Sequence, residues 1–169
     1  MGNLATRALI DAVDRNDRVV GVIDRAELPR RPANFRVAHA FVLNRGGSLL
    51  LQHIAPNERH GGLWGSSVAG YVLAGETYYD ACVRKLRAEL GIQVPPSLIG
   101  KTSMSDLGAI KFLSLFVVSH DGPFTLDPTQ ADTAQFFNLR DLQQALRRTP
   151  GAYTDTLKVA FQLYTSRTP

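Results

Sequence analysis

The stretch Gly70–Ile92, GYVLAGETYYDACVRKLRAELGI, decides the fold, because it joins a glycine-rich loop to a well-marked helix. Thr77 can cap this helix, Asp80 follows three residues later as in a capping box, and Gly91 ends it. These signals predict a helix over residues 77–90. One apolar stripe supports it at helical spacing, formed by Tyr79, Val83, Leu86 and Leu90.

The same stretch resembles the Nudix box. That pattern is Gly, five residues, Glu, seven residues, then Arg-Glu-aliphatic-any-Glu-Glu-any-Gly-aliphatic. Seven of the nine fixed positions match, namely Gly70, Glu76, Arg84, Leu86, Glu89, Gly91 and Ile92. The Leu63-Trp64 turn and the late FFNLRDL segment are also similar to Nudix counterparts. Over roughly residues 10–165 the chain looks most like the Nudix branch that contains isopentenyl-diphosphate isomerase and its hydrolase-like relatives.

The resemblance implies an α/β Nudix fold, an α/β/α sandwich around a mixed β-sheet. We expect one domain with an N-terminal β-hairpin extension over 1–34, a Nudix core over 35–140 with its box at 70–92, and C-terminal helices over 141–169. The extension follows from two short strands, 8–14 and 18–24, on either side of Asn16-Asp17. Further strands are predicted over 36–43 and 48–54 (a buried hairpin turned by 44–47), 66–73, 98–104, 110–120 and 135–137, and further helices over 138–148 and 154–165.

The predicted helix carries the residues that bear on phosphate chemistry. Positions 85 and 89 lie one turn apart and 88 lies beside 89. Active members of the family carry glutamate at all three, and such converging carboxylates suit the octahedral oxygen coordination of Mg²⁺. The ion neutralises diphosphate oxygens and activates water. Here the three residues are Lys85, Ala88 and Glu89, so two carboxylates are missing and one has become a cation.

The resemblance assigns roles to several residues. Glu89 and Glu76 are the expected catalytic residues, and Glu89 with the backbone of Gly70 is the expected metal site. Mg²⁺ or Mn²⁺ is expected to be weakly bound or absent. Arg84 and Trp64 are expected to be structural, and a Glu76–Arg84 ion pair that orders the loop is an alternative to catalysis by Glu76. Substrate phosphate is expected at Lys85, Arg59 and His60, while Glu58 and Asp132 are the nearest acids to replace those missing.

Isomerase chemistry in that branch needs a cysteine and a histidine just ahead of the box. The matching residues here are Ala69 and Tyr71, so isomerisation by that mechanism is not expected. Two functions stay open. The first is a weak or altered Nudix-type hydrolase of a nucleoside diphosphate-linked or other organic diphosphate. The alternative is a catalytically inactive protein that binds such a nucleotide or diphosphate. In both, the partner is a small molecule.

Composition limits the other function classes. The chain has 169 residues, 44% of them hydrophobic, with a net charge of +4 and no dense basic cluster, so nucleic acid is not an expected partner. Its best apolar run, Phe112–Val118, is far shorter than the ~20 residues that cross a membrane, and no membrane partner is expected. A single cysteine, Cys82, excludes an internal disulfide and suits the cytoplasm. The oligomeric state does not follow from the sequence.

Overall fold

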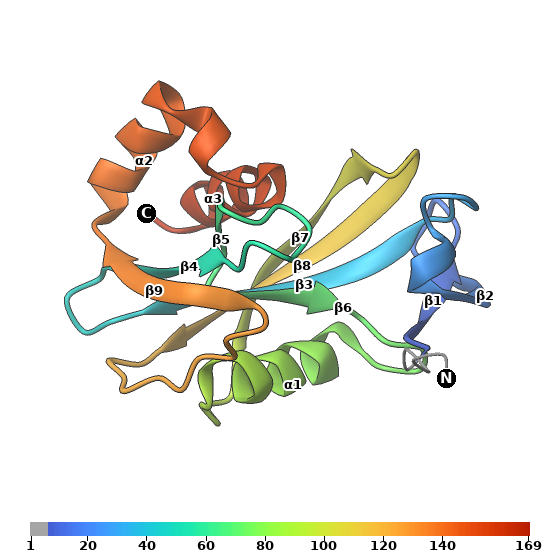
Figure 1. The fold of residues 1–169 in the computed structure, drawn as a ribbon, viewed down its shortest axis with the longest axis horizontal. Helices are drawn as coiled ribbons and strands as arrows, with labels where there is room; N and C mark the ends of the chain where they lie inside the picture. Colours follow the sequence, from blue (N-terminus) through green and yellow to red (C-terminus); the bar gives the residue numbers. More distant parts are fainter. Residues whose placement is uncertain (1–6) are drawn as a thin grey trace.

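The computed structural model describes residues 7–169, so the first six residues of the predicted extension lie outside it. It places a mixed β-sheet between helices on both faces (Figure 1). Helix α1 (Tyr78–Leu90) covers one face, and α2 (Leu139–Arg148) and α3 (Asp155–Arg167) lie on the other. This arrangement confirms the predicted α/β/α sandwich. None of the helices within residues 7–169 is long and apolar enough to cross a bilayer.

The main sheet runs in the order β5-β4-β3-β8-β7, with β6 beside β3 and β9 beside β4. Strands β3 and β8 are parallel, and the other pairs are antiparallel. Its strands are β3 (Phe35–Leu43), β4 (Leu49–Ile54), β5 (Trp64–Gly65), β6 (Val68–Tyr71), β7 (Ser97–Asp106), β8 (Ala109–Ser119) and β9 (Ala131–Phe137).

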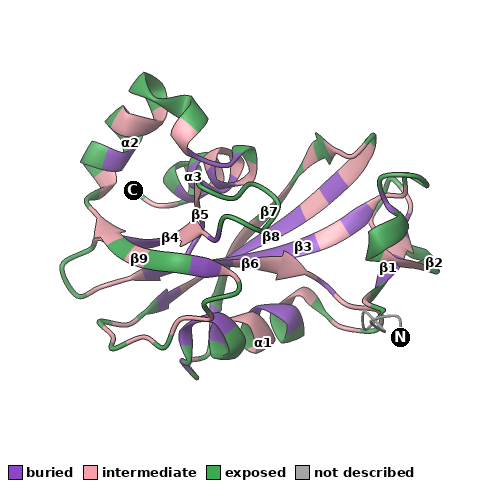
Figure 2. Cartoon of the chain, in the orientation of Figure 1, coloured by how far each residue is buried: buried purple, intermediate pink, exposed green. Residues whose placement is uncertain are grey.

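Strand β3 runs through the centre of the molecule and is buried along most of its length (Figure 2). Because side chains alternate along a strand, its two faces serve two different cores. Phe35 and Phe41 pack into the core on the α3 side, while the small residues Ala38 and Ala40 face the core under α1. Their small side chains let α1 lie close to the sheet, which positions the helix for the site described below.

The predicted hairpin over 36–43 and 48–54 is wrong in its pairing. The turn forms, with the Ser48 N–H donating to Asn44 Oδ1 at 2.9 Å, but β3 and β4 pair only at Leu43 and Leu49. Beyond that point β6 pairs with β3 and β9 pairs with β4. Ser67 sits where the strands separate: its Oγ accepts the Val42 N–H at 2.8 Å and donates to the carbonyl of Leu50. We call this place the fork.

Helix α1 begins and ends as the sequence predicts. The Thr77 hydroxyl accepts the Asp80 N–H at 3.1 Å, and the Asp80 carboxylate accepts the Thr77 N–H at 3.0 Å, which completes a capping box. Gly91 terminates the helix in the left-handed conformation, with φ 69°. The loop before α1 and the helix itself are therefore fixed relative to the sheet.

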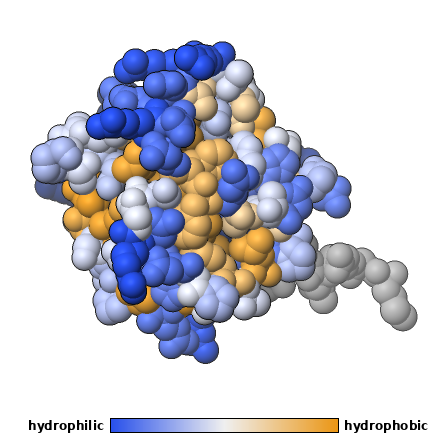
Figure 3. Space-filling model, turned by 90° about the vertical axis from the view of Figure 1, so that its left-hand side faces the viewer, coloured by the Kyte–Doolittle hydropathy of each residue, from blue (hydrophilic) through white to orange (hydrophobic). Residues whose placement is uncertain are grey.

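The N-terminal hairpin forms as predicted and makes a separate two-stranded sheet. Its strands are β1 (Leu9–Val13) and β2 (Val19–Asp24), followed by a short 3-10 helix, η1 (Arg25–Glu27). Its tip residue, Asp17, accepts hydrogen bonds from Arg36 Nε at 2.6 Å and from the Tyr78 hydroxyl at 2.8 Å, and it pairs with Lys101. The hairpin is thus held at one end of the molecule, while the opposite end shows a hydrophobic band between hydrophilic side chains (Figure 3).

Candidate functional site

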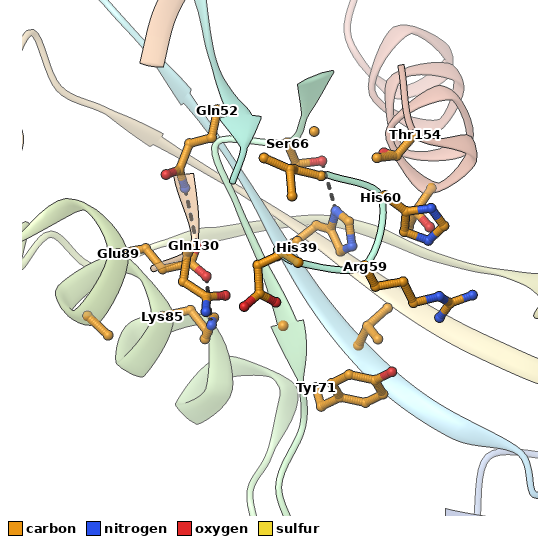
Figure 4. A pocket seen from close by; sticks show the side chains of 18 of the residues that line it. His39, Gln52, Arg59, His60, Ser66, Tyr71, Lys85, Glu89, Gln130 and Thr154 are labelled. Atoms are coloured by element: carbon orange, nitrogen blue, oxygen red, sulfur yellow. Dashed lines mark hydrogen bonds and ion pairs between the residues drawn. The ribbon is translucent and has the colours of Figure 1, made fainter. Parts of the chain in front are cut away.

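A cavity of about 470 Å³ lies beside α1, between the centre of the sheet and the loop 55–63. That volume falls within the range of small-molecule sites. Five of the residues singled out in the sequence line this cavity together, and several appear in Figure 4: Arg59, His60, Gly70, Lys85 and Glu89. Arg84 and Glu58 also line it. Glu76, Trp64 and Asp132 do not belong to its lining.

The helix end of the cavity holds a buried ion pair. Lys85 Nζ lies 2.6 Å from Glu89 Oε1, and the two side chains are only 16% and 6% exposed. The other carboxylate oxygen, Oε2, accepts a hydrogen bond from Gln52 Nε2 at 3.2 Å. Burial raises the pKa of Glu89, although the nearby ammonium and amide act in the opposite direction. Both carboxylate oxygens of Glu89 are therefore engaged by groups of the protein itself.

Gly70 leaves room for the lysine of this ion pair. A Cβ on Gly70 would lie 2.6 Å from Cε and 2.7 Å from Cδ of Lys85, so a larger residue there would force the lysine stem to move. The stem passes across β6 and brings the ammonium to Glu89. Ala88, whose side chain is short, also lines the cavity next to the pair. Both residues that differ from the family pattern, Lys85 and Ala88, thus line the same cavity.

Glu76 and Arg84 form a second ion pair at the border of the cavity, which Arg84 lines and Glu76 does not. Arg84 Nε donates to Glu76 Oε1 at 2.7 Å, and Arg84 also donates to the carbonyl of Tyr71 at 3.0 Å. The Leu73 N–H donates to Glu76 Oε2 at 2.9 Å. Burial opposes ionisation of Glu76, but these bonds outweigh it and lower its pKa. This geometry ties the loop between β6 and α1 to the helix.

Trp64, also expected to be structural, lies at the edge of the sheet. Its ring makes edge-to-face contacts with His53 and Phe137, each with ring centres 5.0 Å apart. Asp132 contacts the same histidine: its Oδ1 lies 2.8 Å from Nδ1 of His53. Of the two acids proposed from the sequence as replacements, only Glu58 reaches the cavity.

The strand end of the cavity carries a charged network that the sequence reading missed. Arg59 donates to Asp106 at 2.8 Å, and Lys111 Nζ donates to the same carboxylate at 2.8 Å and to Thr156 Oγ1 at 2.7 Å. Burial opposes ionisation of Asp106, but the bonds from Arg59 and Lys111 prevail and lower its pKa to about 2. The available signal was Lys111 itself, the one charged residue in the largely apolar strand β8.

His39 lies between the two ends and was also not identified as a site residue. Its Nδ1 lies 2.8 Å from Ser66 Oγ, and both residues line the cavity (Figure 4). Burial, reinforced by the charge of Lys111, lowers the pKa of His39 to about 3, so the ring is neutral at pH 7. Burial and the neighbouring Arg59 also lower the pKa of His60. Neither imidazole adds positive charge to the cavity at neutral pH.

These residues do not fit the magnesium cluster that the family resemblance implies. Within residues 7–169, no group of three or more His, Cys, Asp or Glu side chains gathers as a metal site. Of the three helix positions only Glu89 carries a carboxylate, and Lys85 and Gln52 already engage its oxygens. Mg²⁺ needs several oxygen ligands in octahedral geometry. A single carboxylate, already bound to a lysine and a glutamine of the protein, does not supply them.

Comparisons with known proteins agree with the fold and with the helix-loop pattern. The family model described as NUDIX domain matches residues 33–156. Isopentenyl-diphosphate Delta-isomerase 2 of Aromatoleum aromaticum is 30% identical over 148 residues, covering 84% of this chain and 78% of that protein. An uncharacterised Nudix hydrolase of Nostoc sp. is 29% identical over 92% of this chain and 95% of its own.

Among solved structures, DR0079 from Deinococcus radiodurans is similar over 92% of this chain and 99% of its own, with a TM-score of 0.76 and 25% identity. A MutT protein from Methanosarcina mazei shares the fold over 79% of this chain and 94% of its own, with a TM-score of 0.66 and 17% identity. Together with the loop and helix that carry Gly70, Arg84 and Glu89, the family match shows that this chain belongs to the Nudix family.

Proposed function

We propose that the cavity binds an organic diphosphate, such as a nucleoside diphosphate linked to another group, and that this chain is a Nudix-type hydrolase of weak or altered activity. The observation that carries the proposal is the Lys85–Glu89 ion pair, 2.6 Å long and inside the cavity. A cation of the protein stands beside the carboxylate that in other members of the family would help to gather metal. Such a site keeps a positive charge that can bind phosphate, but it is less able to activate water.

Binding follows from the cations that line the cavity. An ammonium such as that of Lys85 binds phosphate oxygens as a point charge, and at the other end Arg59 and Lys111 together carry one positive charge more than Asp106 balances. Arg25, which also lines the cavity, lies 5.3 Å from the ring centre of Tyr71. A diphosphate presents negative oxygens to all of these groups.

Hydrolysis in this site would depend on Glu89 as the general base. Water attacks a phosphorus atom of the diphosphate, its proton passes to the Glu89 carboxylate, and the bond from phosphorus to the bridging oxygen breaks with its electron pair on the leaving phosphate. The raised pKa of Glu89 makes it a better proton acceptor near neutral pH than an ordinary carboxylate. Lys85 competes for the same carboxylate, which is why we propose slow turnover.

A second candidate is a diphosphate-binding protein without catalysis. The engagement of both Glu89 oxygens by Lys85 and Gln52 favours it, because no free carboxylate oxygen then faces a water. Isomerisation is not proposed, although several relatives carry that name. Ala69 and Tyr71 line the cavity where a thiol and an imidazole would be needed. The one cysteine, Cys82, is buried in the core under α1, and burial raises the pKa of its thiol to about 12.

The test is a substrate panel of nucleoside diphosphates, nucleoside triphosphates and dinucleotides, assayed with Mg²⁺ and with Mn²⁺ and paired with calorimetric binding. We expect binding of at least one member and slow release of phosphate or nucleotide from it. Glu89→Gln should abolish turnover and retain binding, whereas Asp121→Asn, at the exposed pair with Arg45, should change neither. Binding without turnover in the parent would select the second candidate. Unchanged turnover in Glu89→Gln would contradict the proposal and place the chemistry near Glu58 and His60.

A further inference from the structure

The two ends of the cavity differ in charge. At the helix end, Lys85 Nζ lies 2.6 Å from Glu89 Oε1. Arg84 pairs with Glu76 at 2.7 Å. Asp127, whose N–H donates to the carbonyl of Glu89 at 3.3 Å, lines the cavity and adds a negative charge on this side. The helix end therefore has no excess of positive charge among the described residues.

The strand end, in contrast, carries more positive charge than its paired acid balances. Arg59 and Lys111 each lie 2.8 Å from the carboxylate of Asp106. This bond raises the pKa of Arg59, and the Tyr71 hydroxyl on the same side of the cavity acts in the same direction (Figure 4). Arg25 lies over the ring of that tyrosine, 5.3 Å from its centre. Three cations thus gather at this end around one paired carboxylate.

These cations keep hydrogen-bond donors for a ligand. Lys111 Nζ uses two of its three N–H groups, one for Asp106 at 2.8 Å and one for Thr156 Oγ1 at 2.7 Å. Arg59 uses two of its five, both for Asp106, at 2.8 and 3.4 Å. Lys111 is only 7% exposed and lines the cavity, so little water surrounds its ammonium. An anion at this end would therefore meet unused donors as well as unbalanced charge.

The loop 55–63, which presents Arg59, is closed by its own backbone. The Gly61 N–H donates to the carbonyl of Glu58 at 2.9 Å. A Cβ on Gly61 would lie 2.6 Å from the Pro56 carbonyl oxygen, so this turn needs glycine. Glu58, the one acid of the loop, lines the cavity but is exposed, so solvent screens its charge. Arg59 is thus held in place before a ligand arrives, which lowers the entropic cost of binding.

We propose that the strand end binds a terminal phosphate, so that the ligands of this cavity are organic diphosphates whose outer phosphate carries no ester. This inference rests on the proposed function, because it assumes that the cavity takes a diphosphate. A terminal phosphate carries about two negative charges at pH 7 and three acceptor oxygens, which match the unused donors of Arg59 and Lys111. Esterification removes one charge and one of these oxygens. With the outer phosphate at the strand end, the inner phosphate lies toward the helix end and Glu89.

Calorimetric titration of the full chain compares each common nucleoside diphosphate with the same compound methylated on its terminal phosphate. The methyl ester removes one negative charge and leaves the rest of the ligand unchanged. We expect the unmodified ligand to bind at least about tenfold more tightly, the difference that one charge-assisted hydrogen bond makes. Arg59→Gln should reduce this preference to within about threefold, whereas Arg59→Lys, which keeps the charge, should retain more of it.

Two further variants complete the comparison. Arg25→Gln leaves both bonds to Asp106 in place and should reduce the preference in the same direction as Arg59→Gln. Arg45→Gln removes the same charge at the surface pair with Asp121, outside the cavity lining, and should keep the preference of the parent. Circular dichroism checks that the variants are folded, and Arg25→Gln decides the test if Arg59→Gln is not.

The outcomes separate this inference from the proposed function. A parent that binds both forms of the ligand alike overturns the terminal-phosphate site and leaves the proposed function standing. Folded Arg59→Gln and Arg25→Gln variants that keep the preference of the parent have the same meaning. A parent that binds no diphosphate in either form overturns both.

Discussion

At the scale of single residues, two charge clusters of different balance line the cavity. At one end Lys85 and Glu89 neutralise each other. At the other end Asp106 is shared by Arg59 and Lys111, so one positive charge is left over. A buried carboxylate paired in this way stabilises the fold only while it is ionised. The contribution of the second cluster to the free energy of unfolding therefore depends on pH.

Asp106→Asn should lower the free energy of unfolding at pH 7 by about 1–3 kcal/mol, because it leaves the buried Lys111 ammonium without its carboxylate. The pKa of Asp106 is about 2 in the folded chain, below the ordinary value near 3.8. The parent therefore holds its advantage above about pH 4 and loses it as the pH falls toward 2, where Asp106 takes up a proton. Urea titrations of both proteins at several pH values measure this difference.

Asp121→Asn provides the matched control, because Asp121 is half exposed and its Arg45 partner lies 3.7 Å away on the surface. It should change the free energy of unfolding much less than Asp106→Asn does. A loss in Asp106→Asn that stays constant down to pH 2 would contradict the account of the Arg59–Asp106–Lys111 cluster.

The residue scale also shows what the sequence could and could not predict about the site. Lys85 and Glu89 lie one turn apart on one helix face, so their grouping followed from helical spacing, whereas that of Gly70 with Glu89 followed from the family resemblance. Asp106 and Lys111 meet Arg59 only because the loop 55–63 lies over the turn between β7 and β8. Contacts between segments so far apart leave no periodic signal in a single sequence.

At the scale of elements, local sequence signals predicted where helices and strands lie along the chain better than they predicted which strands pair. The helix predicted over 77–90 is α1 because its caps are local, and the strand predicted over 135–137 is the end of the longer β9. The separation of β3 from β4 was not predictable, because both are apolar strands joined by a tight turn, as in a hairpin. It depends on β6 and β9, which come later in the chain, and on Ser67 at the fork.

Ser67→Ala should lower the free energy of unfolding by about 1–3 kcal/mol, because the buried Val42 N–H and Leu50 carbonyl both lose their partner. Ser103→Ala, on the exposed side of β7, is the control with the same chemical change and should stay within about 0.5 kcal/mol of the parent. Urea denaturation measures both. Equal stability of the two variants would show that Ser67 does not hold the fork.

At the scale of the whole molecule, the N-terminal hairpin is connected to the cavity. Arg25 directly follows β2, lines the cavity and lies over the ring of Tyr71. Its position depends on how firmly the hairpin is held by Asp17, whose side chain is almost fully buried against Arg36. The extension is therefore part of the architecture that forms the site.

Asp17→Asn should loosen this attachment, because it removes the charge shared by Arg36, Lys101 and Tyr78 while keeping a residue that tolerates the left-handed φ of 62°. Hydrogen exchange should quicken over residues 9–24 and stay unchanged in α1. Asp14→Asn, in the same turn, keeps the acceptors for the N–H groups of Asn16 and Arg18 and should leave exchange as in the parent. Unchanged protection in Asp17→Asn would mean that β1 alone anchors the hairpin.

We propose that Lys85 and Ala88 together suppress metal-dependent hydrolysis in a site that still binds diphosphates. Two unit charges ~4 Å apart interact by about 4 kcal/mol at an effective dielectric near 20, so Lys85 competes strongly with any cation for Glu89. The free parent should accordingly bind Mg²⁺ only weakly in a calorimetric titration. The double variant Lys85→Glu, Ala88→Glu restores carboxylates at all three positions on the helix.

The most direct test measures hydrolysis of the substrate panel and Mg²⁺ affinity for the parent and this double variant side by side. We predict that the variant binds Mg²⁺ more tightly and hydrolyses at least one diphosphate at least about tenfold faster, which corresponds to ~1.4 kcal/mol of transition-state stabilisation. A parent that already binds Mg²⁺ tightly and turns over as fast as the variant would contradict the claim, and Lys85 would then be a residue the chemistry tolerates.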